Sequence, residues 1–582
     1  MTAATARVHH RVAPVDVFAA ASVVASLLVL AIYVGYFVIY LAYARSLLAF
    51  PFDYDQGEGF ELYDAIRLAS GQNIYLDNAA FPFYSSNYPP VYRLMLVPLI
   101  WLFGPHIWVG RAVTFACSLV IGLFIFLAAR RVLRRETLPR RSGAAQGRRG
   151  WETAAMILAP LLAASAFFAA NYVYYIGPLA RAHIPMVMFA FAGIYFLERG
   201  LDDRRQTTDD RQRTTVVRRP WSVVLGVALL VVAGFTKLQA VDALAAGFAY
   251  LLIRNPKLCL KALLASALFT AAAVLVLNAL SQGQFWLNVV LANVNEYSLD
   301  VTWRYYRQWF QLEGALIVCS VLYVAWDGAA AVRARSFQPL TIWSLYFVAG
   351  SAMGMLTGKW GAGPTYLVAA VAVSCVCTVG LLWRVAQRMA PFVWRRADHE
   401  GGGARHAAQY GLLCLLCAGV FLWQATLNVH LPTSGRLFGT VARLLGIPPE
   451  QSVYPPYPYY DVIGPFLLGH LLDPADTRNG WELARIARQA PGPVWSEEAM
   501  ITLNAGKEVV TNPTQLLNLA KSNMLDTAEM RRMIRNKEFG AVILRAQFYP
   551  LDVLEEIGRN YRWATTLQMN GFDYQVLYPK DE

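Results

Sequence analysis

The feature that most constrains the fold is a series of long apolar runs. Each is about 16 to 25 residues long, which matches the thickness of a bilayer core. The composition agrees, with 57% hydrophobic and only 15% charged residues. The runs lie near residues 17–40, 107–130, 153–171, 183–198, 221–236, 238–254, 261–280, 312–328, 340–356, 365–385 and 409–427. The sequence therefore predicts a polytopic α-helical membrane protein with about eleven transmembrane helices.

The distribution of basic residues predicts how the chain is oriented. Cytoplasmic loops collect Lys and Arg. If the N-terminus is cytoplasmic, the even-numbered connections are all basic; they cover residues 130–149, 199–219, 254–261, 333–335 and 384–405. The formal net charge of +13 is then a signal of topology, and no nucleic-acid partner is expected. High Ala and Arg usage and an outward-facing site suggest a bacterial inner membrane.

The chain divides into a transmembrane part, residues 1–427, and a C-terminal part, residues 428–582, that an odd number of spans places outside the cytoplasm. The latter is less apolar and alternates expected strands (493–496, 541–544, 574–577) with expected helices (513–522, 527–536). This pattern predicts a small extracytoplasmic α/β domain. All seven cysteines lie in or beside apolar runs, which is more typical of packing residues than of disulfides or metal ligands.

A dense group of carboxylates, residues 52–61, begins the first outer loop (residues 42–106) and is the candidate active centre. Asp55 and Glu58 are its main candidates, although their spacing is also typical of a capping box before a helix over 60–70. Asp53, Glu61 and Asp64 are expected to be solvated or to be helix-start charges. The apolar run 91–103 is too short to span and is expected to lie along the membrane surface.

Further motifs follow the carboxylate pair in order. The helix ends at Gly71 and leads to Tyr75 and Asp77; the segment 88–90 leads through Phe103-Gly104 to Arg111; weaker motifs lie at 180–183, 236–239 and 495–498. This order resembles the polytopic GT-C glycosyltransferases that use polyprenyl-phosphate sugars, such as the lipid A aminoarabinose transferases and protein O-mannosyltransferases. Many relatives have adjacent acidic residues, whereas Gln56-Gly57 separates the pair here.

The resemblance implies a GT-C fold and transfer of a sugar from a polyprenyl-phosphate donor to an extracytoplasmic glycan, lipid or protein acceptor. Such a displacement needs a carboxylate to accept the acceptor's proton and cations to hold the departing phosphate, and it inverts the anomeric carbon. We expect Asp55 to be the base and Glu58 to orient the base or the acceptor. No obligatory metal is expected; if Mg²⁺ or Mn²⁺ is used, Glu58 would bind it.

Isolated cations at the membrane edge of the outer loops are the candidates for the phosphate site. Such cations are disfavoured on that side unless an anionic group, such as a lipid phosphate, compensates them. The favoured candidates are Arg181, Lys237 and Lys359, with Arg304 or Arg307 as helpers. Snorkelling to lipid headgroups is the alternative for each one.

Candidate contacts to the acceptor or sugar are Tyr88, Tyr92, His183 and Glu296. The aromatic segments 171–175 and 454–461 are typical of an interfacial belt, with sugar stacking as the alternative. Two other functions remain open from the sequence, namely a transporter of lipid-linked glycans and a non-catalytic glycolipid-binding protein. In each case membrane lipids are expected partners.

Overall fold

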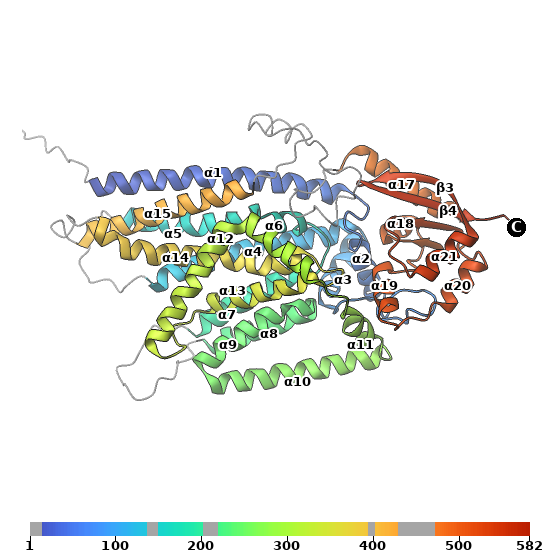
Figure 1. Ribbon diagram of the computed structural model, residues 1–582, viewed down its shortest axis with the longest axis horizontal. Helices are drawn as coiled ribbons and strands as arrows, with labels where there is room; N and C mark the ends of the chain where they lie inside the picture. Colours follow the sequence, from blue (N-terminus) through green and yellow to red (C-terminus); the bar gives the residue numbers. More distant parts are fainter. Residues whose placement is uncertain (1–13, 137–148, 202–218, 394–401, 429–471, 582) are drawn as a thin grey trace, which may run out of the picture.

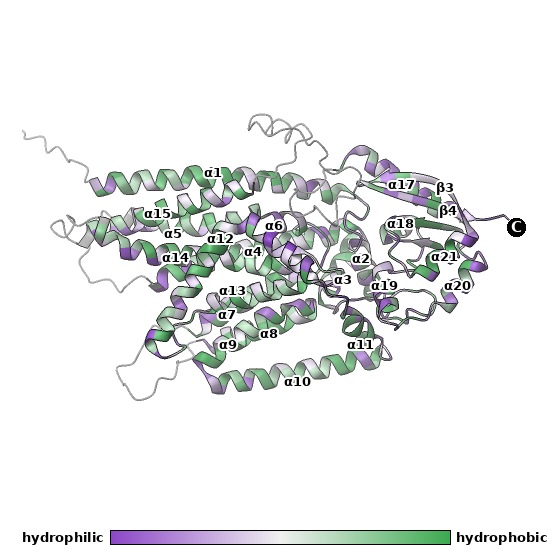
Figure 2. Cartoon of the chain, in the orientation of Figure 1, coloured by the Kyte–Doolittle hydropathy of each residue, from purple (hydrophilic) through white to green (hydrophobic). Residues whose placement is uncertain are grey.

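The computed structural model describes residues 14–136, 149–201, 219–393, 402–428 and 472–581, and it has two parts (Figure 1). A long bundle of helices forms one part, and a mixed α/β domain sits at one end of it. Apolar residues dominate the bundle helices, whereas hydrophilic residues gather on the domain and at helix ends (Figure 2). The aromatic segment 454–461 lies outside the described residues.

Each of the eleven apolar runs coincides with a helix of the bundle. The helices are α1 (Pro14–Ala49), α4 (Ile107–Glu136), α5 (Arg149–Ala169), α7 (His183–Gly200), α8 (Pro220–Thr236), α9 (Val241–Arg254), α10 (Pro256–Leu280), α12 (Leu299–Ala334), α13 (Ile342–Met353), α14 (Val368–Val393) and α15 (Gly402–Leu427). Within the described residues, seven are long and apolar enough to cross a membrane: α1, α4, α5, α10, α12, α14 and α15. The other four have 12 to 18 residues. The predicted class, a polytopic helical membrane protein, is confirmed, with seven full-length candidate spans.

Close helix packing in the bundle depends on small residues. Gly193 of α7 faces Gly226 of α8, and a Cβ on either glycine would lie 2.9 Å from the other's carbonyl oxygen. Without water to drive association, close backbone approach is a main source of helix contact in a membrane. α14 is the most buried of the seven candidate spans, and all seven cysteines are buried and free of disulfides, as predicted.

Short helices lie between the bundle and the α/β domain (Figure 1): α2 (Glu58–Ala69), α3 (Val91–Phe103), α6 (Asn171–Ile176) and α11 (Gln284–Val289). α3 exposes apolar side chains, with Trp101 and Leu102 exposed by 70% and 71%. This exposure agrees with a helix at the membrane surface. α6 is different, because its six residues are all buried; they form part of the core instead of an interfacial belt.

The predicted helix after the carboxylates is confirmed, but the capping box is not. α2 begins at Glu58, and its N-cap, Gly57, makes no side-chain cap. One half of the predicted motif is seen, since the Glu58 carboxylate accepts a hydrogen bond from the backbone N–H of Asp55 at 3.1 Å, but the helix begins at Glu58 and not directly after Asp55. The carboxylate pair therefore does not owe its spacing to helix capping.

The C-terminal domain has a four-stranded sheet of order β1-β2-β4-β3. β1 (Val494–Ser496) pairs in parallel with β2 (Ala541–Leu544), and β4 (Phe572–Pro579) is antiparallel to both β2 and β3 (Tyr561–Met569). Five helices accompany the sheet: α17 (Pro474–Gln489), α18 (Ala499–Asn504), α19 (Pro513–Lys521), α20 (Ala528–Arg535) and α21 (Leu551–Asn560). All the predicted strands and helices of this domain are confirmed. β3 was missed because most of its residues are exposed, and so it lacks a clear apolar face.

A polar cluster ties α12, α13 and α14 together. The Asp327 carboxylate pairs with Arg384 at 2.7 Å and accepts hydrogen bonds from the hydroxyls of Thr341 and Ser344 at 2.8 and 2.6 Å. The Asp327 side chain is 3% exposed. A carboxylate this deeply buried depends on its cation, because an unpaired charge is costly to desolvate.

We therefore expect Arg384→Ala to lower the free energy of unfolding by about 3–5 kcal/mol, as for other buried pairs that lose one partner. The thermal unfolding midpoint in mild detergent measures this effect. Arg485→Ala is the matched control, because its pair with Glu482 is about half exposed and should contribute less than about 1 kcal/mol. Equal losses for the two variants would contradict the structural role of Asp327.

Candidate active site

A cavity of about 440 Å³ lies between the bundle and the C-terminal domain. Its charged lining residues are Asp55, Glu61, Arg93, Arg181, Lys237 and Lys359, and His183 and Tyr88 lie beside them. The C-terminal domain contributes Asn512, Thr514, Asn518 and Phe548. Residues from five distant parts of the sequence therefore meet in one space.

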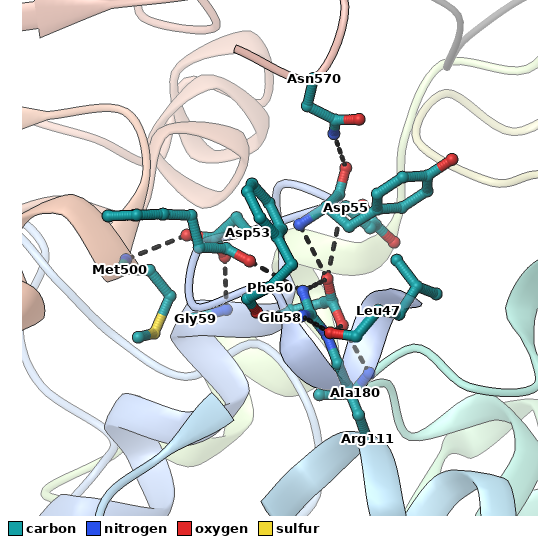
Figure 3. Close-up of polar contacts among 12 residues, drawn as sticks. Leu47, Phe50, Asp53, Asp55, Glu58, Gly59, Arg111, Ala180, Met500 and Asn570 are labelled. Atoms are coloured by element: carbon teal, nitrogen blue, oxygen red, sulfur yellow. Dashed lines mark hydrogen bonds and ion pairs between the residues drawn. The ribbon is translucent and has the colours of Figure 1, made fainter. Parts of the chain in front are cut away.

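The loop that carries Asp55 is held by a buried ion pair between Glu58 and Arg111 (Figure 3). Arg111 lies on α4, and its guanidinium contacts both oxygens of Glu58 at 2.9 and 2.8 Å. It also donates to the backbone carbonyls of Leu47, Phe50 and Phe52 at 2.5, 2.5 and 2.8 Å. One side chain thus holds the end of α1 and the start of the loop in place.

The Glu58 carboxylate has no free acceptor position facing the cavity. Besides Arg111, it accepts hydrogen bonds from the backbone N–H groups of Tyr54 and Ala180 at 2.9 and 2.7 Å. Burial alone would raise the pKa of Glu58, but Arg111 and these N–H groups outweigh burial and lower it. Glu58 is therefore a buried anion that shapes the loop and does not line the cavity.

The C-terminal domain holds the same loop from the other side. Asp53 accepts hydrogen bonds from the backbone N–H of Gly59 at 2.6 Å and of Met500 at 2.9 Å. Asn570 donates to the carbonyl of Tyr54 at 2.8 Å (Figure 3). Burial raises the pKa of Asp53 to about 6. Of the two alternatives expected for Asp53, the solvated one is wrong, because the domain covers it, whereas its contact with Gly59 in the first turn of α2 agrees with a helix-start charge.

Asp55 is the carboxylate of this loop that reaches the cavity. It lies 3.3 Å from Nε of Arg181, which precedes α7. Arg181 crosses directly over Gly57, where a Cβ would lie 1.2 Å from its guanidinium nitrogen. The glycine at 57 thus lets Arg181 lie across the loop beside Asp55, and a larger residue there would require its guanidinium to move.

A second acidic group lies on α2. Glu61 and Asp64 were expected to be solvated or to be helix-start charges. Glu61 does lie in the first turn of α2, but neither side chain is solvated, since both are buried and pair with Arg93 at 2.7 and 3.2 Å. Burial raises the pKa of Glu61 and of Asp64. The spacing of Glu58, Glu61 and Asp64, three residues apart on one helix face, was the signal that could have identified a buried acidic stripe.

Two lysines of the cavity are not neutralised by carboxylates. Lys237 follows α8, hydrogen-bonds Nε2 of His183 and lies 4.6 Å from the ring centroid of Tyr88. Lys359 donates to the carbonyl of Asn293 at 2.7 Å. Within the described part of the chain, neither lysine has an ion-pair partner. Burial, together with Arg181, lowers the pKa of Lys237 well below its ordinary value, and burial also lowers that of Lys359.

Four other predicted site residues are not brought into the cavity. Tyr92 is buried and hydrogen-bonds the carbonyl of Gly110 and the hydroxyl of Thr114 at 3.2 and 3.1 Å. Glu296 is exposed and pairs with Lys521 at 3.1 Å. Arg304 and Arg307 are exposed on α12. The neighbouring Tyr305 lines the cavity instead, because it lies on another face of the same helix.

No group of three or more His, Cys, Asp or Glu side chains within the described ranges could hold a metal ion. The two carboxylates of the cavity are each paired with an arginine, Asp55 with Arg181 and Glu61 with Arg93. The cavity therefore offers an anion site, at Lys237 and Lys359, near the Asp55 carboxylate.

Glu58→Gln tests whether the buried pair holds the loop. The neutral side chain leaves Arg111 buried without its counter-charge, and we expect hydrogen exchange at the amides of Tyr54 and Asp55 to become at least about tenfold faster. Glu508→Gln is the control, because Glu508 is 49% exposed and lies 3.9 Å from Arg67. Unchanged exchange in the Glu58 variant would show that other contacts suffice.

Comparison with known proteins gives matches at the level of structure only. No family model and no curated protein sequence matches the chain. ArnT from Cupriavidus metallidurans in the apo state matches with a TM-score of 0.50 and 12% identity, over 94% of this chain and 98% of ArnT. ArnT bound to undecaprenyl phosphate matches with a TM-score of 0.49, 13% identity and coverage of 93% and 98%.

The Archaeoglobus fulgidus oligosaccharyltransferase in the apo form matches with a TM-score of 0.46 and 12% identity, over 93% of this chain and 73% of that one. The match to apo ArnT spans nearly the whole of both chains and therefore establishes the fold. The resemblance predicted from the motifs is confirmed at the level of the fold: the chain has an ArnT-like fold.

Proposed function

We propose that the protein is an inverting glycosyltransferase that moves a sugar from a polyprenyl-phosphate carrier to an extracytoplasmic acceptor. The observation that supports this best is the pairing of charges in the cavity. Asp55 and Glu61 each have an arginine, whereas Lys237 and Lys359 have no carboxylate partner among the described residues. A bound anion would favour the charged forms of both lysines.

The two lysines favour a phosphate as that anion. Lys237 is only 5% exposed, and the like charges of Arg181 and Lys359 act on it. Clustered cations that destabilise one another become favourable when a phosphate binds between them. Undecaprenyl phosphate, which ArnT binds, is a ligand of this class. The apolar bundle below the cavity suits its lipid chain.

In the proposed reaction the acceptor oxygen attacks the anomeric carbon of the donor. The proton of the acceptor hydroxyl passes to the Asp55 carboxylate, and the bond from the anomeric carbon to the phosphate oxygen breaks with its electron pair. The polyprenyl phosphate gains a negative charge, which Arg181, Lys237 and Lys359 stabilise. A single displacement from the opposite face inverts the anomeric centre.

The remaining predicted residues have supporting roles in this proposal. Glu58 positions the proposed base, Asp55, because its carboxylate accepts a hydrogen bond from the backbone N–H of Asp55. His183 and Tyr88 hold Lys237 and so act on the phosphate site through it. The proposal requires no obligatory metal ion, since the cavity carboxylates Asp55 and Glu61 are paired with arginines. The reaction would occur on the outer side of a bacterial inner membrane, with the N-terminus in the cytoplasm and membrane lipids around the bundle.

Asp55→Asn should lower the rate of sugar transfer by about a hundredfold or more, because the amide cannot accept the proton. The donor should stay bound. Turnover is measured with a labelled polyprenyl-phosphate sugar, and bound lipid by mass spectrometry of extracts. Asp77→Asn is the control, since Asp77 is exposed in the same outer loop.

The double variant Arg181→Ala, Lys237→Ala should have the opposite effect and lose the co-purifying polyprenyl phosphate. Ordinary phospholipid alone on both the wild type and this variant would contradict the proposed donor. Near-normal transfer by Asp55→Asn would exclude Asp55 as the base.

The lowered pKa of Lys237 predicts how donor binding depends on pH. Phosphate binds the charged amine, so binding raises the Lys237 pKa and takes up a proton. Affinity for polyprenyl phosphate should therefore be full below the lowered pKa of the free protein and fall as the pH rises through it. In Lys237→Arg this fall should disappear, because arginine stays charged. The phosphate of the ligand ionises in the same way with the wild type and with Lys237→Arg, so it does not cause a difference between them. Identical pH profiles of affinity for the two proteins would contradict the role of Lys237.

A further inference from the structure

The side of the cavity formed by the C-terminal domain differs in chemistry from the side around Lys237. Its lining residues are Asn512, Thr514, Asn518 and Phe548 from the domain, with Asn295 and Trp360 facing them from the bundle. They carry amides, a hydroxyl and aromatic rings, and none is charged. This group, here called the neutral subsite, is not explained by the phosphate or by the base.

Two aromatic rings meet across the neutral subsite. Trp360 and Phe548 lie edge to face, with ring centroids 6.0 Å apart and planes at 86°. Both are half-buried, so part of each ring remains accessible. Rings with an apolar face and a fixed orientation are suited to the C–H faces of sugars.

Both rings are held by backbone contacts. Trp360 donates its backbone N–H to the carbonyl of Glu296 at 2.8 Å, and its own carbonyl accepts from Asn295 at 2.9 Å. Phe548 ends a loop whose four backbone N–H groups, residues 545–548, all donate to the buried Glu497 carboxylate at 2.5–3.0 Å. The platform is therefore preorganised, which reduces the entropy lost on binding.

The polar groups of the neutral subsite are incompletely satisfied. Oδ1 of Asn518 and Oδ1 of Asn295 are buried acceptors with no hydrogen-bond partner within the described residues. Asn518 is only 6% exposed. Unpaired buried acceptors are costly unless a ligand donates to them. A hydroxyl-rich, uncharged ligand supplies such donors.

We propose that the neutral subsite binds the acceptor and that the acceptor is an uncharged glycan. This inference rests on the proposed function, in which the donor phosphate occupies the opposite side of the cavity beside Lys237. A phosphorylated lipid acceptor would need a further cation here. Lys521, whose Nζ lies 4.8 Å from the Trp360 ring centroid, is already paired with Glu296 at 3.1 Å. Unpaired amide acceptors in the same subsite as two aromatic rings match a chain of neutral sugars.

The test uses full-length Asp55→Asn protein in lipid nanodiscs loaded with polyprenyl phosphate, so that binding is measured without turnover. The probes are neutral manno-, gluco-, galacto- and arabino-oligosaccharides, compared with a phosphorylated glycolipid and a Ser/Thr peptide. We expect at least one neutral series to bind, as measured by saturation-transfer NMR and titration. Trp360→Ala or Asn518→Ala should weaken its binding about tenfold.

Two further variants separate binding from folding. Trp360→Phe should retain most of the affinity, because the ring is kept. Trp563→Ala is the matched control, since Trp563 is a 64% exposed tryptophan on β3 of the C-terminal domain and does not line the cavity. All variants should retain polyprenyl phosphate, and their thermal unfolding midpoints are compared with that of the parent protein.

The outcomes distinguish the two proposals. No oligosaccharide binding by protein that retains polyprenyl phosphate would overturn the glycan acceptor and leave the transferase standing. Binding of the peptide or the phosphorylated glycolipid that depends on Trp360 would also overturn it. Trp360-dependent oligosaccharide binding by protein that retains no polyprenyl phosphate would support the neutral subsite and contradict the proposed donor.

Discussion

The arrangement of the cavity depends first on the buried pair between Arg111 and Glu58. Both side chains are fully buried, and Arg111 also holds three backbone carbonyls around the end of α1. A buried charge that loses its partner costs about 3–5 kcal/mol, so neither residue is easily replaced. Because Glu58 in turn holds the N–H groups of Tyr54 and Asp55, the pair determines where the Asp55 carboxylate lies.

The charges around that loop are arranged so that positive charge remains available. Arg181 offsets Asp55, and Arg93 offsets Glu61 and Asp64. Lys237 and Lys359 are left without carboxylates in the described structure. Burial disfavours charge on all these groups, raising the pKa of Glu61 and lowering that of Lys237. A fixed set of cations in a partly dry site suits an anionic leaving group, because little reorganisation is needed.

The C-terminal domain completes the site. It reaches the acidic loop through Met500 and Asn570, and it reaches α11 through Gln515, which donates to the side chain of Asn288 at 2.8 Å. These contacts bring α19 and Phe548 to the cavity. The domain therefore both orders the loop and contributes lining residues, so its removal would alter the site and expose Asp53.

The sequence alone determined the helices and the class of protein, because apolar runs of membrane length must satisfy their backbone hydrogen bonds within each segment. It also identified Asp55, Arg181, Lys237, Lys359, Tyr88 and His183, which meet in one cavity. Single Lys or Arg residues on the side of the membrane where they are disfavoured can be recognised from the sequence, without knowledge of the tertiary structure.

Only the tertiary structure decided which polar groups are buried and what they face. Glu61 and Arg93, which were not predicted as site residues, line the cavity because α2 and α3 pack together, whereas the predicted site residues Arg304 and Glu296 are exposed. Asn518 and Phe548 enter the cavity only because the domain docks on the bundle. Helical and strand periodicity is local, but the burial and pairing of a charge depend on segments far apart in the chain. For that reason the sequence predicted the elements and several site residues, and the packing determined the site.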